Sequence, residues 1–155
     1  MKKIITLAAA LAGLLLVVAT GEALAKQPLK IGYSDWPGYT AWEIGKAKGI
    51  FKKNGVDVEL VWFPVYTDSL TAVNTGKLDG NLQTWSDLMA PLAEGIDLKV
   101  VQVLDNSFGN DAIVAKPGIN SVKELKGKTV GTELATVDHF MLLKALAMNG
   151  MTEKD

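Results

Sequence analysis

GYSDWPGYTAW, residues 32–42, is the stretch that decides the fold, because it ends one apolar pattern and opens another. Leu29 to Tyr33 alternates like a strand, Pro37-Gly38 is a turn pair, and the apolar residues after Ala41 have helical spacing. These patterns predict a strand, a loop and a helix. In an open α/β sheet such a loop lies at the carboxyl end of its strand, where ligands bind and the first helical N–H groups lack partners.

Three side chains of this loop, Asp35, Trp36 and Tyr39, are candidates for a binding site. Two interpretations fit the loop taken alone. In one, the aromatic rings cover the top of the core and Asp35 caps the helix; in the other, all three contact a ligand.

The N-terminus is typical of an export signal. Lys2 and Lys3 form a basic region, Ile4 to Val18 is apolar, and Ala23-Leu-Ala25 is a small-x-small cleavage site. The apolar run is shorter than the roughly 18 to 20 residues that span a bilayer. We therefore expect residues 1–25 to be a signal peptide that is cleaved after Ala25.

The composition excludes several classes of site. The chain has no cysteine, so disulfides, thiol nucleophiles and a lipid-bearing cysteine are absent, and a soluble periplasmic protein is the favoured expectation. Without residues 1–25 the 16 basic and 17 acidic residues become 14 and 16, a net charge of −2, which argues against a nucleic-acid partner.

Further along the chain, turn signals separate alternating segments. Strands are predicted at Val56–Phe63, at Asn81–Gln83 and at Leu98–Leu104, which is the strongest, and helices are predicted between them. Thr67 or Asp68 is expected to cap the first of these helices. Pro91 allows either one helical turn before it or a helix that begins near Ala90. The β-α-β-α-β-α-β order is that of a parallel sheet with helical crossovers.

After a polar stretch at residues 105–111 the pattern changes. Short strands are predicted at Ala112–Ala115 and Thr129–Thr132, with a helical turn at Ser121–Leu125 and a helix at Thr136–Met148. The segment after residue 111 is too short to be stable as an independent lobe of this kind.

The chain lacks the sequence motifs of common enzymes, and its one histidine, His139, excludes a His-rich metal site. Instead, one arrangement recurs along the chain: a strand is followed by a polar or aromatic loop and then by the start of a helix. These junctions are expected to converge on one rim of the sheet. Helix capping is the alternative interpretation of each junction. The junctions are Asp35-Trp36, Tyr66–Asp68, Thr84–Asp87 and Thr132–Thr136.

Several segments resemble the periplasmic solute-binding proteins of nitrate/sulfonate/taurine-type ABC importers. They are the signal peptide, LKIGY at 29–33, the segment at 72–80, DAIV at 111–114 and LKGKTVG at 125–131. The resemblance implies an α/β, two-lobed periplasmic-binding-protein fold of type II that closes by hinge motion. Lobe one is expected at 26–108 and the crossing with the start of lobe two at 109–155. Because family members are about twice this length, the resemblance also implies that the chain is the N-terminal portion of a longer protein.

The resemblance also implies a function. The protein is expected to capture a small polar solute and deliver it to an ABC permease, without catalysis, cofactor or metal. The alternatives are an enzyme on the same fold, as in menaquinone- or thiamine-precursor pathways, and an exported sensor domain. The implied ligand-binding residues are Asp35, Trp36, Tyr39, Tyr66, Thr84, Trp85, Asp111, Thr132, Glu133, Thr136 and His139.

Overall fold

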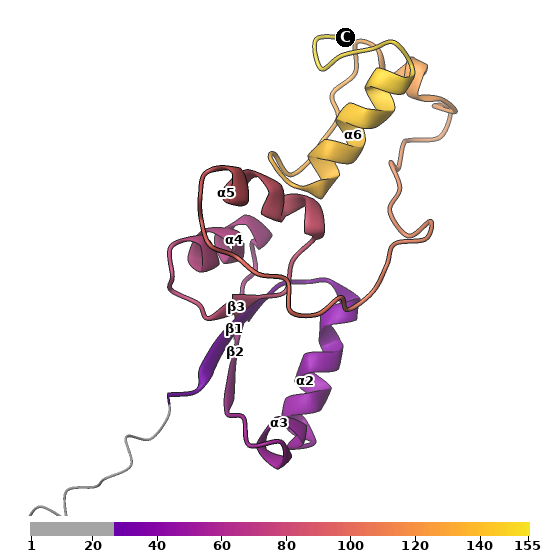
Figure 1. Cartoon of the computed structure of the whole chain (residues 1–155). Coiled ribbons are helices and arrows are strands. Elements are labelled where there is room, and N and C mark those ends of the chain that lie inside the picture. Colours follow the sequence, from indigo (N-terminus) through magenta and orange to yellow (C-terminus); the bar gives the residue numbers. More distant parts are fainter. Residues whose placement is uncertain (1–26) are drawn as a thin grey trace, which may run out of the picture.

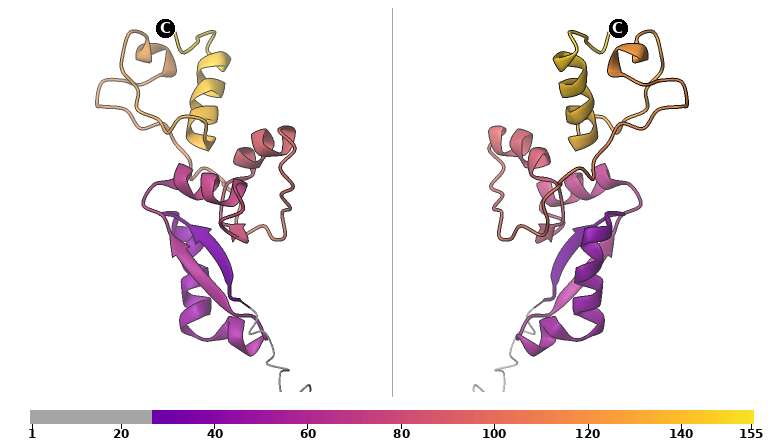
Figure 2. Two further views of the ribbon diagram at one scale, coloured as in Figure 1. Left: turned by 90° about the vertical axis from the view of Figure 1, so that its left-hand side faces the viewer. Right: turned by 90° about the vertical axis from the view of Figure 1, so that its right-hand side faces the viewer.

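The computed structural model describes residues 27–155 (Figure 1). The predicted signal peptide and its cleavage site lie outside the described residues. Two groups of elements are visible, and we refer to residues 27–95 as the sheet part and to residues 119–155 as the C-terminal part. Residues 96–118 connect them without helix or strand (Figure 2).

The sheet part contains a parallel sheet with the strand order β2-β1-β3. β1 (Leu29–Tyr33) pairs with β2 (Val58–Trp62) over its full length, from Leu29 opposite Val58 to Tyr33 opposite Trp62. β3 (Gly80–Asn81) is short and pairs with Ile31 and Gly32. The parallel arrangement predicted for the first three strands is therefore confirmed, and their carboxyl ends meet at one edge.

Short helices connect these strands. The 3-10 helix η1 (Pro37–Tyr39) leads into α2 (Thr40–Ala47), and α3 (Ile50–Lys53) follows after Gly49, whose φ of 66° is left-handed. α4 (Tyr66–Asn74) lies between β2 and β3. Because β2 and β3 flank β1 on opposite sides, right-handed crossovers place α2 and α4 on opposite faces of the sheet, as Figure 1 illustrates.

The helix around Pro91 combines the two predicted possibilities. A 3-10 turn, η2 (Trp85–Leu88), comes first, and α5 (Met89–Ala93) follows directly. Pro91 is the third residue of α5, so its missing N–H falls among the first-turn groups that have no partner within a helix.

Two small apolar clusters stabilise the chain. In the sheet part Val58, Ala72, Leu78 and Leu82 are buried between the sheet and its helices. In the C-terminal part Leu125, at the end of η3 (Val122–Leu125), is buried, as are Leu142 and Leu146 of α6 (Val137–Met148). The predicted turn at Ser121–Leu125 is confirmed, and Ser121 and Glu124 form a capping box at its start.

The fourth predicted strand, Leu98–Leu104, is wrong, and so are the two short strands predicted at Ala112–Ala115 and Thr129–Thr132. All three segments lie outside any sheet, and Val101 is 92% exposed. The physical reason is that a strand exists only through hydrogen bonds to a neighbouring strand, and no neighbour lies beside these segments in the described chain. An apolar run by itself does not create the partner.

The described residues contain no helix that is both long enough and apolar enough to cross a bilayer.

Candidate functional site

The last residue of β2 and the loops that follow β1, β2 and β3 form one rim, which we define as residues 34–39, 62–66 and 82–87. β1 and β2 end side by side, with Tyr33 opposite Trp62. This register brings Asp35 next to Trp62, whose indole Nε1–H donates to Asp35 Oδ1 at 3.2 Å. The interpretation in which Asp35 caps the helix is not observed, because η1 begins after Trp36 without a side-chain cap.

The alternation of Val56, Val58, Leu60 and Trp62 in the sequence predicts that Trp62 is a packing residue, and this prediction is wrong. Its side chain is 51% exposed. The residue is the last of an edge strand, so no further layer covers its ring, and the indole lies at the rim. Trp62 is therefore an additional candidate for ligand contact.

A second indole–carboxylate pair lies beside the first. Trp36 Nε1–H donates to Asp105 Oδ2 at 2.8 Å, which ties the start of the connecting segment to the rim. Gly38 leaves room for this pair, because a Cβ there would collide with the Asp105 carboxylate and would approach Trp36 Nε1 to 2.7 Å. Any larger residue at position 38 would displace one partner.

Tyr39 is the last residue of η1. Its side chain is buried. Burial, followed by the negative charges of Asp105 and Asp87, raises the pKa of Tyr39 to about 12. The phenol is therefore a permanent hydrogen-bond donor at neutral pH.

The centre of the rim is a hydrogen-bonded group around Asp87. Tyr66 Oη donates to Asp87 Oδ2 at 2.6 Å, and Ser86 Oγ donates to Oδ1 at 3.0 Å. The Thr84 backbone N–H donates to Tyr66 Oη at 3.0 Å. Thr84 thus contributes its backbone rather than its side chain to the network.

Burial controls the acid–base properties of this group. It raises the pKa of the Asp87 carboxyl, opposed by the hydrogen bonds from Tyr66, Ser86 and the Val137 N–H, and the nearby charge of Asp138 raises it further. Burial is also the main reason that the pKa of Tyr66 is raised, and its hydrogen bond to Asp87 adds to the effect. Tyr66 is therefore a neutral donor in this pair.

From the C-terminal part, the loop before α6 reaches the sheet part. Glu133 Oε1 accepts a hydrogen bond from the Thr67 backbone N–H at 3.2 Å, and the buried Thr136 donates its hydroxyl to the Glu133 carbonyl at 2.8 Å. Ala135 has a φ of 61°, a left-handed conformation that is uncommon for alanine. Thr132 Oγ1 is buried and has no hydrogen-bond partner in the described part of the chain.

The predicted cap of α4 is absent. The N-cap residue is Val65, and neither Thr67 nor Asp68 caps the helix with its side chain. The helix begins earlier than expected, at Tyr66, so both residues fall within its first turn. The cap comes instead from Glu133.

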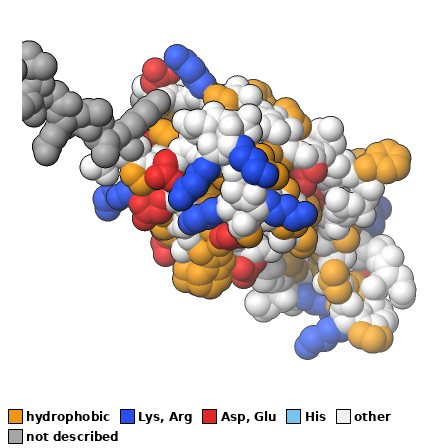
Figure 3. Space-filling model, turned by 90° about the horizontal axis from the view of Figure 1, so that it is seen from below, with side chains coloured by type: hydrophobic (Ala, Val, Ile, Leu, Met, Phe, Trp, Pro, Cys, Tyr) orange, Lys and Arg blue, Asp and Glu red, His pale blue; other side chains and the backbone are white. Residues whose placement is uncertain are grey.

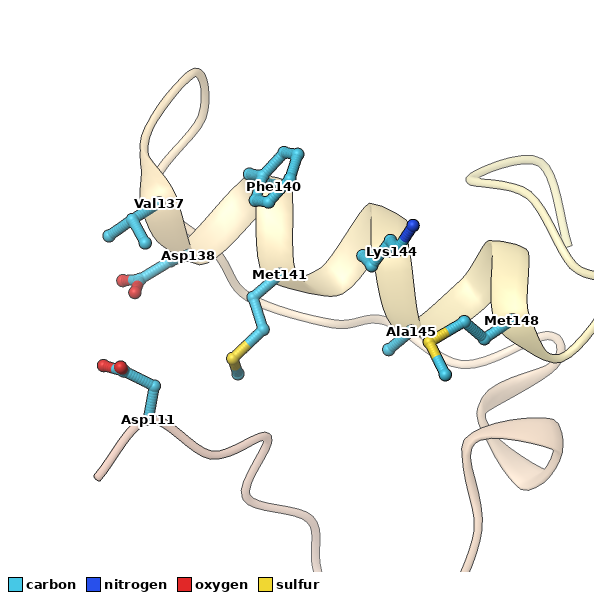
Figure 4. Close-up of a pocket in the computed structure, with 8 residues that line it drawn as sticks. All are labelled: Asp111, Val137, Asp138, Phe140, Met141, Lys144, Ala145 and Met148. Carbon is cyan, nitrogen blue, oxygen red and sulfur yellow. The ribbon is translucent and has the colours of Figure 1, made fainter. Parts of the chain in front are cut away.

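Two other predicted site residues lie at the edge of this network. Trp85, the first residue of η2, is 62% exposed. Asp111 faces Asp138 across a hollow of about 360 Å³ along α6, which Phe140, Met141 and Met148 also line (Figure 4).

His139 is held within the C-terminal part. Its Nε2 lies 2.7 Å from Glu153 Oε1, and Nδ1 accepts the Ala135 N–H at 3.2 Å. These contacts come from residues after position 132, so the structure does not bring His139 to the rim.

The sequence did not identify three candidate residues of the site: Trp62, Asp105 and Asp138. The signal for Trp62 was its position at the carboxyl end of a strand parallel to β1. Asp105 lies in a polar segment whose path the sequence does not show, and Asp138 was hidden by the regular pattern of α6. Within residues 27–155 no group of acidic and histidine side chains is arranged to hold a metal ion.

Comparison with known proteins identifies the family of this chain. Residues 36–155 match the family described as NMT1/THI5 like, and the chain belongs to this family. Similar proteins include a binding protein of Brucella abortus (32% identical over 130 residues, 83% of this chain) and an aliphatic sulfonates-binding protein of Escherichia coli (31% over 163 residues, the whole chain). A thiamine biosynthesis protein of Haemophilus influenzae is 29% identical over 161 residues. All three carry provisional names.

The chain spans 40% of the Brucella protein and 49% of each of the other two, about half the length of these relatives. No solved structure matches the chain.

Proposed function

We propose that this chain belongs to an exported solute-binding protein that captures a small polar molecule and delivers it to an ABC permease. The observation that carries this proposal is the convergence, at the carboxyl ends of three parallel strands, of aromatic rings and hydrogen-bonding groups. Two of the relatives are named as binding proteins, which supports the same role. Ligands of open α/β sheets bind at this edge.

The chemistry of the rim favours a particular kind of solute. Carboxylates of Asp35 and Asp87 lie there with the rings of Trp36 and Trp62, and the Asp105 carboxylate is bonded to Trp36. In the described chain no lysine is a hydrogen-bond partner of these groups. Aromatic faces and carboxylates together suit a cation or an amine. We infer that the solute carries a positively charged or strongly donating nitrogen group.

The basic residues lie elsewhere. All 16 are lysine, so the bidentate anion binding that arginine provides is absent from the sequence. Exposed lysines gather at the end of the sheet part opposite the rim, where α2, α3 and the turn between them carry Lys46, Lys48, Lys52 and Lys53 (Figure 3). This separation of charge directs anions away from the rim and cations toward it.

A thermal-shift screen of the whole mature protein tests both proposals. Amines, amidines and zwitterions are compared with nitrate, bicarbonate and simple alkanesulfonates. We expect stabilisation by members of the first group, and a loss of affinity for the best amine in Asp35→Asn. Stabilisation by the plain anions alone would overturn the inferred solute chemistry, while no stabilisation by any small molecule would count against the binding role.

An enzymatic role is the second candidate, because one relative is named as a thiamine biosynthesis protein. Mass spectrometry separates the two. A binding protein returns the stabilising compound unchanged after prolonged incubation, whereas an enzyme converts it.

A further inference from the structure

Asp105 belongs to the connecting segment, yet it lies against the first loop of the rim. Trp36 Nε1–H donates to its Oδ2 at 2.8 Å, although the two residues are 69 positions apart in the sequence. The approach is close, because a Cβ at Gly38 would collide with the same oxygen. Glycine at position 38 therefore makes room for a carboxylate that comes from another part of the chain.

The carboxylates of Asp87 and Asp105 differ in what they have left to bind. Both oxygens of Asp87 accept hydroxyl groups, from Tyr66 and Ser86, and its side chain is buried. Asp105 is exposed and, within the described residues, accepts one hydrogen bond, through Oδ2. Its Oδ1 is therefore able to accept a donor from a solute, whereas the oxygens of Asp87 serve the internal network.

Trp36 adds an aromatic surface to this acceptor. The indole N–H lies in the plane of the ring, so its hydrogen bond to Asp105 uses the edge of the ring and not its faces. The Trp36 side chain is 37% exposed. A carboxylate beside a partly exposed indole attracts a cation through its own charge and through the quadrupole of the ring.

A second negative charge lies nearby. Asp105 and Asp87 both act on the phenol of Tyr39, whose pKa is raised first by burial and then by these two charges. The salt bridges among the described residues are those of Lys126 and His139, so no basic side chain neutralises either carboxylate there. A cation that binds between the two carboxylates would relieve their repulsion.

We propose that Asp105 is a solute-binding residue whose Oδ1 receives the nitrogen group of the solute while Trp36 holds Oδ2. This inference rests on the proposed binding role and adds Asp105 to Asp35. Because Asp105 belongs to the connecting segment, residues 96–118, the solute contacts that segment as well as the loop after β1. Capture of the solute therefore fixes the connecting segment against the rim.

The test uses methylammonium, acetamidinium and benzamidinium chlorides as simple cations, added to the whole protein at constant ionic strength. Binding is followed by the indole N–H resonance of Trp36. Asp105→Asn removes the charge but keeps an oxygen that can accept the indole N–H. We expect the Trp36 resonance of this variant without ligand to stay close to that of the parent. Its affinity for the cation that binds the parent best should fall about five- to twentyfold, the effect of losing a charge-assisted hydrogen bond.

Two matched variants separate a binding role from a structural one. Asp97→Asn removes the same charge from the same exposed segment and should bind the cation as the parent does. Gly38→Ala should move the Trp36 resonance in the absence of any cation and should also weaken binding, because its Cβ displaces the pair. The rest of the spectrum reports whether each variant is folded.

The outcomes distinguish this inference from the proposed function. Equal affinities in the parent and Asp105→Asn, or an equal loss in Asp97→Asn, would overturn the assignment of Asp105 and leave the binding role intact. The assignment would also be wrong if the parent bound none of the three cations, even where an anion stabilised the protein. The binding role itself fails only if no small molecule stabilises the protein.

Discussion

β1 and the segment Leu98–Leu104 are both short apolar runs, yet only one of them is a strand. β1 lies between two neighbours that satisfy its backbone groups on both edges. Leu98–Leu104 has no neighbouring strand in the described chain, and its side chains after Leu98 are exposed, Val103 by 67%. The difference shows that apolar sequence determines only the capacity to form a strand, while the partner determines whether the strand forms.

Among the substitutions that compare the ordered sheet with the irregular segments, replacement of a glycine by alanine is expected to change the stability most. Gly32 of β1 lies so close to β3 that an added Cβ would be 2.6 Å from both Asn81 Oδ1 and Leu78 Cδ1. We expect Gly32→Ala to lower the free energy of unfolding by about 2 to 3 kcal/mol through overpacking. Urea unfolding measures the change.

Gly131 is the matched control from the irregular segment. An added Cβ there meets no atom within 4 Å, and the residue is exposed. Gly131→Ala should change the stability by less than about 0.5 kcal/mol. Equal effects at the two glycines would mean that the tight contact between β1 and β3 does not form.

A smaller effect is expected at Ser69 of α4, whose side chain is fully buried. Its hydroxyl donates to the Tyr66 carbonyl at 2.8 Å and accepts from Asn81 Nδ2 at 3.1 Å, so it joins α4 to the end of β3. Ser69→Ala should cost about 1 to 2 kcal/mol in urea unfolding. Ser107→Ala, in the exposed connecting segment, should be neutral, and a neutral Ser69→Ala would show that the α4–β3 connection adds nothing.

The next effect concerns ligand affinity rather than stability. Trp36 and Trp85 lie at the rim, whereas Trp42 packs on Phe51 of α3 with ring centroids 5.4 Å apart. Replacement of Trp36 or Trp85 by alanine should weaken solute binding by more than about 1 kcal/mol in calorimetry. Trp42→Ala should instead lower the melting temperature. If the Trp36 and Trp85 variants bind the solute as tightly as the parent, these two side chains do not contact it.

The smallest effect is a pH dependence that comes from Asp87. Because its pKa is raised above 3.8 in the folded protein, the folded state holds a proton that the unfolded state has already lost. Between the ordinary and the raised value, the stability therefore falls as pH rises. In Asp87→Asn this contribution disappears.

Urea unfolding of the parent and of Asp87→Asn at several pH values from about 4 to 7 measures this pH dependence of the stability. The salt bridge of Asp155, whose pKa is lowered to about 2, is common to both proteins and cancels in the difference. Parallel pH profiles would contradict the raised pKa of Asp87.

Much of the rim could be predicted from the sequence because local patterns determine it. A strand, a Pro-Gly turn and a helix in succession place Asp35 and Trp36 at the end of β1 without knowledge of the rest of the chain. The role of Trp62 could not be predicted in the same way, because alternation identifies a face of a strand and not the layer that covers it. The contact of Asp105 with Trp36 spans 69 residues, and no local pattern carries that information.

The central claim, that solute binds at the rim, is tested most directly by the indole N–H resonances of the four tryptophans. Each gives one signal in a nitrogen–proton correlation spectrum of the whole protein, and the compound that stabilises it most is titrated in. We predict that the signals of Trp36, Trp62 and Trp85 shift together with one dissociation constant while that of Trp42 remains in place. A shift of Trp42 alone, or saturation by the compound without any shift of the three rim signals, would contradict the account.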